Sequence, residues 1–335
     1  MRMEAGRMRS MALPPAEVIS ENKVILEERR QRTDNNPQAK FGEQMDAALF
    51  VNHPYSIPVI GWEHEMATLN RDDAKEFYDR YYYPNNAILI VSGDITGEQI
   101  HKLAQEIYGP IQAGDIPKRT RTIAPPLFDN VTIQASNPAL RQPVVQMMVK
   151  APSYRTSRKD AYALQVLEEI MSGGPTSRFY KSLVVNQKIA SGAGLSYRPN
   201  AWDETQLWVY ASPLPKHQPQ EIKNALDEEL RLLIRDGVTA EELNGAITRM
   251  QDNAVYALDS LSGPAMIFGQ AIASGTQIDD IEYWPVRIAE VTAEDVQAVA
   301  KKYINPDAQN RLRFVTGYLL PDYKAAPQKQ RRGQR

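Results

Sequence analysis

Two glutamates are the residues of this sequence best placed to do chemistry. Glu21 and Glu28 stand seven positions apart, so in a helix they lie one above the other on the same face. That face falls between Val24 and Ile25, and two carboxylates among apolar side chains need a cation or hydrogen-bond donors. The alternative is a solvated face with i,i+4 ion pairs such as Glu28–Arg32.

The neighbouring residue types limit which sites this chain can build by itself. Glu27 is expected to point nearly opposite to the apolar stripe, and His53, in a His-Pro-Tyr segment, is expected to fix a loop. There is no cysteine, which excludes disulfides, thiolate metal sites and a cysteine nucleophile. The four histidines form no H-x-x-x-H or H-x-x-H pair; they are His53, His64, His101 and His217. A histidine-rich metal site made from this chain alone is therefore not expected.

Length and charge limit the function classes. At roughly 150 residues per domain, 335 residues suggest two domains. A formal net charge of −2 gives no electrostatic footprint for nucleic acid or an anionic membrane. No apolar run approaches the roughly 20 residues that a membrane-spanning helix needs.

An internal repeat indicates how the chain is organised. Residues 70–93 and 292–317 both predict a capped helix, a Tyr-x-x-Pro stop and a strand ending in Val-x-Gly. Asp73, Tyr81 and Pro84 match Asp295, Tyr303 and Pro306 at one common offset. The alternative is that the two segments are similar only because any helix–proline–strand unit has this pattern. A repeat is still considered first, because overlooking one leads to a wrong fold assignment.

The repeat sets the expected domain boundaries. We expect residues 1–114 to be the remainder of a first domain, 115–127 a linker, 128–320 a second domain, and 321–335 a polar basic tail. If the two copies were of equal length, the first would lack about 80 to 95 residues at its front.

The elements that must position the glutamates follow from hydrophobic spacing and end signals. Helices are expected over residues 15–31, 38–51, 70–82, 96–108, 157–172, 176–185, 218–235, 240–258, 263–274, 278–286 and 293–302. Strands are expected over 87–92, 131–135, 144–149, 189–197, 206–211 and 312–317. Strands gather at the front of the second copy and helices at its back, which predicts an α+β fold with helices packed on one face of each sheet.

Several segments together resemble one family. Residues 21–37 read Glu-Asn-Lys-Val-Ile-Leu-Glu-Glu-Arg-Arg-Gln-Arg-Thr-Asp-Asn-Asn-Pro, similar to the E-x-x-V-V-L-E-E-R-R-x-R-x-D-x-x-P segment of the M16 zinc metallopeptidases. The His-Pro-Tyr segment at 53–62, Tyr-Tyr-Tyr-Pro-Asn-Asn-Ala at 81–87, Val-Ser-Gly-Asp at 91–94 and Gly-Gly-Pro-Thr-Ser-Arg at 173–178 follow in the family's order. The resemblance covers nearly the whole chain and is nearest to the short bacterial members.

The resemblance implies a fold and a metal site. The fold would be two homologous α+β domains, the first of them N-terminally truncated here. Family members hold Zn²⁺ through two histidines of an inverted H-x-x-E-H motif and a glutamate roughly 75 residues later. The position that matches the third ligand is Glu28. Glu21 matches a glutamate that does not bind the metal itself but contacts the residues that do. This sequence contains no H-x-x-E-H, so the general base and two zinc ligands are missing, and zinc binding is expected to be weak or absent.

The resemblance also implies a role. It predicts a zinc-dependent metalloendopeptidase that hydrolyses peptides or unfolded segments, inactive as written. Non-catalytic partner subunits of the family carry an arginine and, seven residues later, a tyrosine; here those places hold Val184 and Ser191, which favours the catalytic type. The alternative is a non-catalytic scaffold or partner subunit. Expected partners are a peptide substrate and a second M16 subunit, as a homodimer or as a heterodimer with an Arg/Tyr-bearing partner. The expected compartment is the bacterial periplasm or cell envelope.

Overall fold

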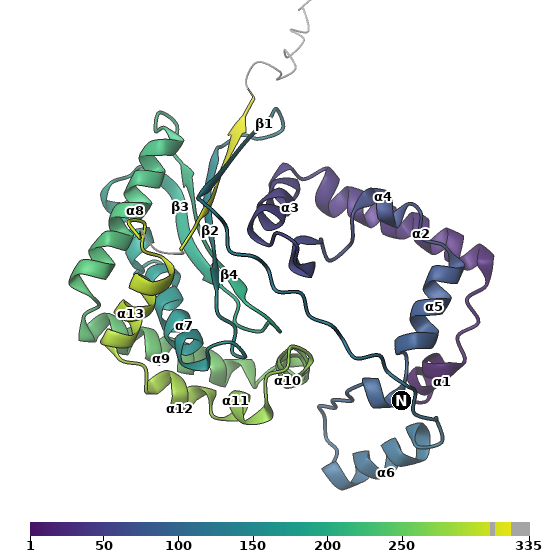
Figure 1. Ribbon diagram of the computed structural model, residues 1–335. Coiled ribbons are helices and arrows are strands. Elements are labelled where there is room, and N and C mark those ends of the chain that lie inside the picture. Colours follow the sequence, from purple (N-terminus) through teal and green to yellow (C-terminus); the bar gives the residue numbers. More distant parts are fainter. Residues whose placement is uncertain (309–311, 323–335) are drawn as a thin grey trace, which may run out of the picture.

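The computed structural model describes residues 1–308 and 312–322, and the tail expected at 321–335 lies almost wholly outside this range. The first third of the chain contains helices only (Figure 1). They are α1 (Arg2–Arg9), α2 (Pro15–Arg29), α3 (Pro37–Leu49), α4 (Glu63–Met66), α5 (Arg71–Tyr81) and α6 (Gly97–Tyr108). A π-helical turn, Arg30–Asp34, continues α2. None of the helices in the described part is long and apolar enough to cross a bilayer.

Local sequence signals explain where these helices begin. Prolines occupy the first turns of α2 and α3, where a missing N–H costs nothing. Asn70 and Asp73 form a reciprocal capping box at the start of α5, and Thr96 and Gln99 form another at α6. The helix expectations for this region are therefore confirmed to within a few residues.

One five-stranded sheet lies in the rest of the described chain. Its strands are β1 (Val131–Asn137), β2 (Val144–Ala151), β3 (Ala190–Tyr197), β4 (Thr205–Pro213) and β5 (Val315–Pro321), in the order β1-β5-β2-β4-β3. β1 and β5 are parallel and the other pairs are antiparallel. β5, the last strand of the described residues, thus lies between β1 and β2. The fold is α+β, as expected.

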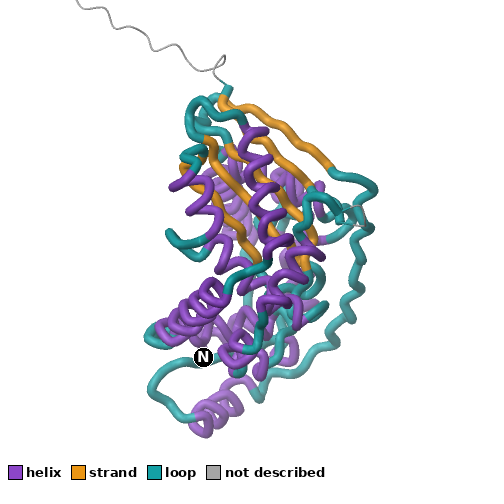
Figure 2. Tube along the Cα trace, turned by 90° about the vertical axis from the view of Figure 1, so that its left-hand side faces the viewer, coloured by secondary structure: helices purple, strands orange, loops and turns teal. Residues whose placement is uncertain are grey.

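The main hydrophobic core lies on one face of the sheet. Figures 1 and 2 show helices stacked along this face. They are α7 (Arg158–Ser172), α8 (Pro219–Asp236), α9 (Ala240–Ala257), α12 (Trp284–Ala289) and α13 (Ala293–Tyr303), with α10 (Gly263–Ala273) and α11 (Ile278–Glu282) beside them. Alternate residues of β2, Val145, Met147 and Val149, join this core, as period-two side chains must.

The second face of the sheet is covered by α3. Phe41, Met45 and Leu49 are fully buried against Val144, Met148, Val315 and Leu319 of β2 and β5. Gly317 permits this close approach, because a Cβ there would lie 2.6 Å from the Met45 sulfur. The expectation that helices pack on one face only is therefore wrong for this sheet, since a helix from the first third of the chain buries the other.

One strand expectation is also wrong. Residues 87–92 form no strand, and Ile88, Leu89 and Val91 are each more than 40% exposed. A strand exists only when another strand pairs with it, and no described residue pairs with this segment. Two smaller differences concern β5, which begins at Val315 rather than Leu312, and residues 278–286, which split into α11 and α12 just before Pro285.

Candidate functional site

Helix α2 places the two glutamates on its exposed side. Glu21 is exposed, and Glu28 forms an i,i+4 ion pair with Arg32 at 2.9 Å, with 41% of its side chain exposed. Val24, the apolar residue beside them, is exposed too, by 55%. The glutamates are thus on one face, as predicted, but the pair is solvated, and the apolar flank is surface.

The residues of this chain do not fit a zinc ion by themselves. Within residues 1–308 and 312–322, no three His, Cys, Asp or Glu side chains come together in a way that could hold a metal. A catalytic zinc site needs three protein ligands. Glu28 offers one carboxylate, and Arg32 already compensates its charge.

The buried side of α2 carries an arginine whose burial the sequence did not indicate. Arg29 is 3% exposed and donates two hydrogen bonds to the Glu43 carboxylate of α3, both at 2.9 Å. It also donates to the carbonyl of Gly61 at 2.6 Å and lies 3.4 Å from Asp34. The Glu43 hydrogen bonds raise the pKa of Arg29 above its ordinary value. In the Glu-Glu-Arg-Arg run, this arginine fastens α2 to α3 and holds Glu28 on the outside.

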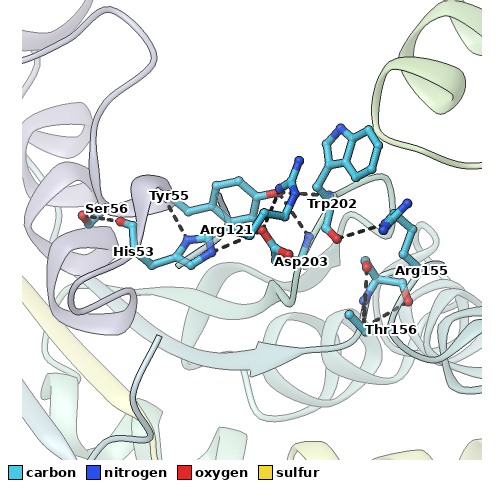
Figure 3. Close-up of polar contacts among 9 residues, drawn as sticks. His53, Tyr55, Ser56, Arg121, Arg155, Thr156, Trp202 and Asp203 are labelled. Atoms are coloured by element: carbon cyan, nitrogen blue, oxygen red, sulfur yellow. Dashed lines mark hydrogen bonds and ion pairs between the residues drawn. The ribbon is translucent and has the colours of Figure 1, made fainter. Parts of the chain in front are cut away.

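His53 fixes a loop, as expected. Its Nδ1 accepts the backbone N–H of Tyr55 at 3.1 Å, so the proton belongs on Nε2, which faces the Asp203 carboxylate at 3.4 Å (Figure 3). Arg121, from the segment between α6 and β1, donates to the same carboxylate at 2.8 Å. His53 is itself 6% exposed.

Tyr55 and Trp202 extend this polar cluster across the molecule. The Tyr55 hydroxyl accepts the backbone N–H groups of Trp202 and Asp203 at 3.0 and 3.4 Å. The guanidinium groups of Arg121 and Arg155 lie 4.4 and 4.2 Å from the Trp202 ring, within cation–π range (Figure 3). The His-Pro-Tyr segment therefore ties the helical first third to the connection between β3 and β4.

A third set of polar residues lies where α3 meets β4. The Oδ1 of Asp46, the Oε1 of Gln206 and the Nε1 of Trp208 are buried without hydrogen-bond partners in the described part of the chain. Burial raises the pKa of Asp46 to about 6, against the lowering effect of a hydrogen bond with Gln206. Burial also raises the pKa of Glu168, on α7, to about 7. These carboxyl groups titrate near neutral pH, but neither belongs to the Glu21–Glu28 face of α2.

The positions expected to distinguish subunit types hold small or apolar side chains. Val184 packs partly buried against the main core, and the Ser191 hydroxyl donates to the Ser212 carbonyl at 3.3 Å. Neither offers a charged or aromatic group to a ligand.

Comparisons with known proteins agree with this architecture. The family model described as "Peptidase M16 inactive domain" matches residues 68–250, more than half of the chain. The zinc protease PqqE of Helicobacter pylori is 25% identical over 315 residues, covering 93% of this chain and 69% of that protein. An uncharacterized zinc protease of Mycobacterium leprae is 28% identical over 301 residues, covering 86% of this chain and 64% of that protein.

Solved structures show the same fold. A protease from Helicobacter pylori superposes with a TM-score of 0.86 at 23% identity, over 96% of this chain and 75% of that chain. A peptidase M16 inactive domain from Pseudomonas fluorescens gives 0.76 at 15% identity, over 94% and 72%. The chain spans about two thirds of the length of the curated relatives named above. With the motifs of residues 21–37 and 173–178 and the matched fold, this chain belongs to the M16 peptidase family.

Proposed function

We propose that this chain supplies the carboxylate side of the zinc site in a catalytic-type M16 metalloendopeptidase that hydrolyses peptides or unfolded segments. The observation that carries the proposal is the outer face of α2. There Glu21 and Glu28 stand in line beside exposed Val24. An exposed apolar side chain flanked by two carboxylates offers part of a surface on which a further helix can pack.

The roles of the two glutamates differ in this proposal. Glu28 would be the third zinc ligand, leaving its pairing with Arg32, and the two histidines would come from an H-x-x-E-H helix outside these 335 residues. Glu21, two turns earlier on the same face, would accept the ring N–H of one of those histidines and so fix its orientation. The relatives named zinc proteases support this assignment.

Zinc retention tests the proposal. An H-x-x-E-H helix designed to pack on α2 is fused ahead of Met1, and zinc per chain is measured by atomic emission after dialysis against a chelator. We expect about one zinc per fused chain and none in the unfused chain, which should also cleave no peptide. Glu28→Gln should abolish retention, because a neutral amide is a poor ligand, and Glu21→Gln should weaken affinity by roughly 10- to 100-fold.

Glu27→Gln is the matched control. Glu27 is adjacent in sequence, but it lies off the Glu21–Glu28 face and pairs with Arg30. It should leave zinc retention unchanged. If Glu27→Gln abolished retention while Glu28→Gln had no effect, both the helical register and the assignment would be wrong.

A non-catalytic role is the second candidate. It is favoured by the description of the family model that matches residues 68–250 as an inactive domain. In that case the chain would be a scaffold or the partner of a second M16 subunit, as a homodimer or heterodimer. A fused protein that holds zinc but cleaves no peptide would favour this role. We propose the periplasm or cell envelope as the compartment, supported by the fold shared with a protease of Escherichia coli described as periplasmic (TM-score 0.68, 18% identity).

A further inference from the structure

An apolar cavity lies between α9, α10 and the α11–α12 corner, and none of its lining residues belongs to α2. Its volume is about 810 Å³. Its walls come from the end of α9, from α10 and from the α11–α12 corner, and its floor from Tyr154 and Gln165. Three of the residues that line it are also open to solvent: Val255 (65% exposed), Leu258 (66%) and Ile267 (40%). The cavity is therefore reachable from outside.

The cavity lining contains two carboxylates, those of the buried Asp280 and of the exposed Glu282. Asp280 has a side chain only 2% exposed and pairs with Arg158 at 2.9 Å and with Arg287. Arg287 also donates to the Tyr162 hydroxyl at 3.0 Å. A ligand with a carboxylate or phosphate would find both arginines of this cluster engaged and the Glu282 carboxylate in the lining, so the wall disfavours an anionic ligand.

The uncharged polar groups of the cavity are amides and hydroxyls. Gln165 accepts the Trp284 indole N–H at 3.1 Å and donates to the Tyr154 hydroxyl at 2.7 Å, which fixes the floor. Asn200 and Gln251 bring further amides to the lining. The Thr276 hydroxyl, in a residue 6% exposed, is buried without a partner in the described part of the chain. A buried unpaired hydroxyl is costly, and a ligand carbonyl would satisfy it.

We propose that this cavity binds the apolar side chains of an extended peptide segment. The substrates would then be unfolded peptides rich in bulky apolar residues. The inference rests on the proposed peptidase function. Ligand sites are concave, mostly apolar and of roughly 300 to 1,000 Å³, with a few placed polar groups. A peptide offers apolar side chains to the walls of α9 and α10, and backbone donors and acceptors to the amides and the hydroxyl. A fatty acid uses the walls but leaves its carboxylate without a free cation.

Fluorescence anisotropy tests the proposal on the full chain in a chelator, so that no cleavage intervenes. The probe is a fluorescein-labelled neutral dodecapeptide rich in leucine and phenylalanine, and the control peptide has serine at those positions. Ala254→Phe projects a ring into the cavity and should weaken binding of the probe at least 10-fold. Asn253→Phe adds the same ring at an exposed neighbouring position outside the lining and should change binding less than twofold. The serine peptide and palmitate should not compete.

Several results would overturn the inference: wild-type affinity in Ala254→Phe, equal losses in both variants, or displacement of the probe by palmitate. If Ala254→Phe fails to fold by circular dichroism, Val255→Asp, on an exposed side chain of the same wall, replaces it with the same expected loss. A photo-leucine version of the probe should crosslink to α9 and α10; crosslinks elsewhere would contradict the site.

The two proposals fail separately. Cavity-dependent peptide binding in a chain whose fused form holds no zinc would support the cavity and contradict the zinc assignment. Zinc-dependent cleavage that is unaffected by Ala254→Phe would support the zinc assignment and contradict the role of the cavity.

Discussion

Replacing Arg29 by methionine tests whether the buried ion pair holds α2 in place. The change removes the cation from Glu43, whose side chain is 13% exposed, and removes the donor to the Gly61 carbonyl. Breaking a buried pair by deleting one partner costs about 3 to 5 kcal/mol, because the other charge stays buried. The unsatisfied carbonyl adds about 1 to 3 kcal/mol if no water reaches it. We expect the free energy of unfolding to fall by at least 3 kcal/mol.

The assay is urea unfolding at pH 7, followed by circular dichroism and by hydrogen exchange of the α2 and α3 amides. Arg30→Met is the matched control, because Arg30 is 59% exposed and pairs with exposed Glu27; such pairs contribute about 0 to 1 kcal/mol. The double change of Arg29 and Glu43 to methionine should recover most of the loss, since an apolar pair leaves no unpaired charge. A single variant within 1 kcal/mol of wild type, or a double variant no better than the single one, would refute the reasoning.

Three further changes probe the contacts between the helical region and the sheet. Gly317→Val should lower the free energy of unfolding by about 1 to 3 kcal/mol, because the larger side chain overpacks against Met45. An unchanged melting temperature would show that α3 can shift to accommodate the valine. Asp46→Asn should raise the free energy of unfolding at pH 7.5 by about 1 to 3 kcal/mol and change it little at pH 4. The reason is that a folded pKa raised to about 6 stabilises the fold at low pH and loses that effect as pH rises through 6; equal effects at both pH values would contradict it. Tyr55→Phe removes the acceptor of two backbone N–H groups and should cost about 1 to 3 kcal/mol, with faster hydrogen exchange at Trp202 as the measurement; unchanged exchange would argue against the bond.

Local signals predicted most elements of this fold. Capping boxes such as Asn70–Asp73 and prolines at first turns act within a few residues, so they are legible in one sequence. The strand at residues 87–92 was predicted wrongly, because Ile88, Leu89 and Val91 have the composition of a strand while the pairing that makes one is not local. The packing of α3 on the second face of the sheet could not be predicted either. The spacing of Phe41 and Met45 indicates an apolar stripe, but it does not indicate which surface that stripe packs against.

The candidate site was predicted in part. The shared face of Glu21 and Glu28 followed from helical periodicity, and so did the alternative i,i+4 pair with Arg32 that the structure contains. Arg29 was missed because a buried arginine looks like a surface one until its partner Glu43, fourteen residues away, is placed beside it.

The position of β5 between β1 and β2 sets the order in which this protein can be assembled on the ribosome. β1 is made early, yet its hydrogen-bonding partner is the last strand of the described chain, so it stays unpaired until residues 315–321 emerge. The groove that receives α3 contains Val315 and Leu319 and is also incomplete until then. α3 therefore cannot complete its packing until these residues have been made, and closing so long a loop is slow. Insertion of β5 between β1 and β2 therefore completes the sheet and the docking of α3 in one step.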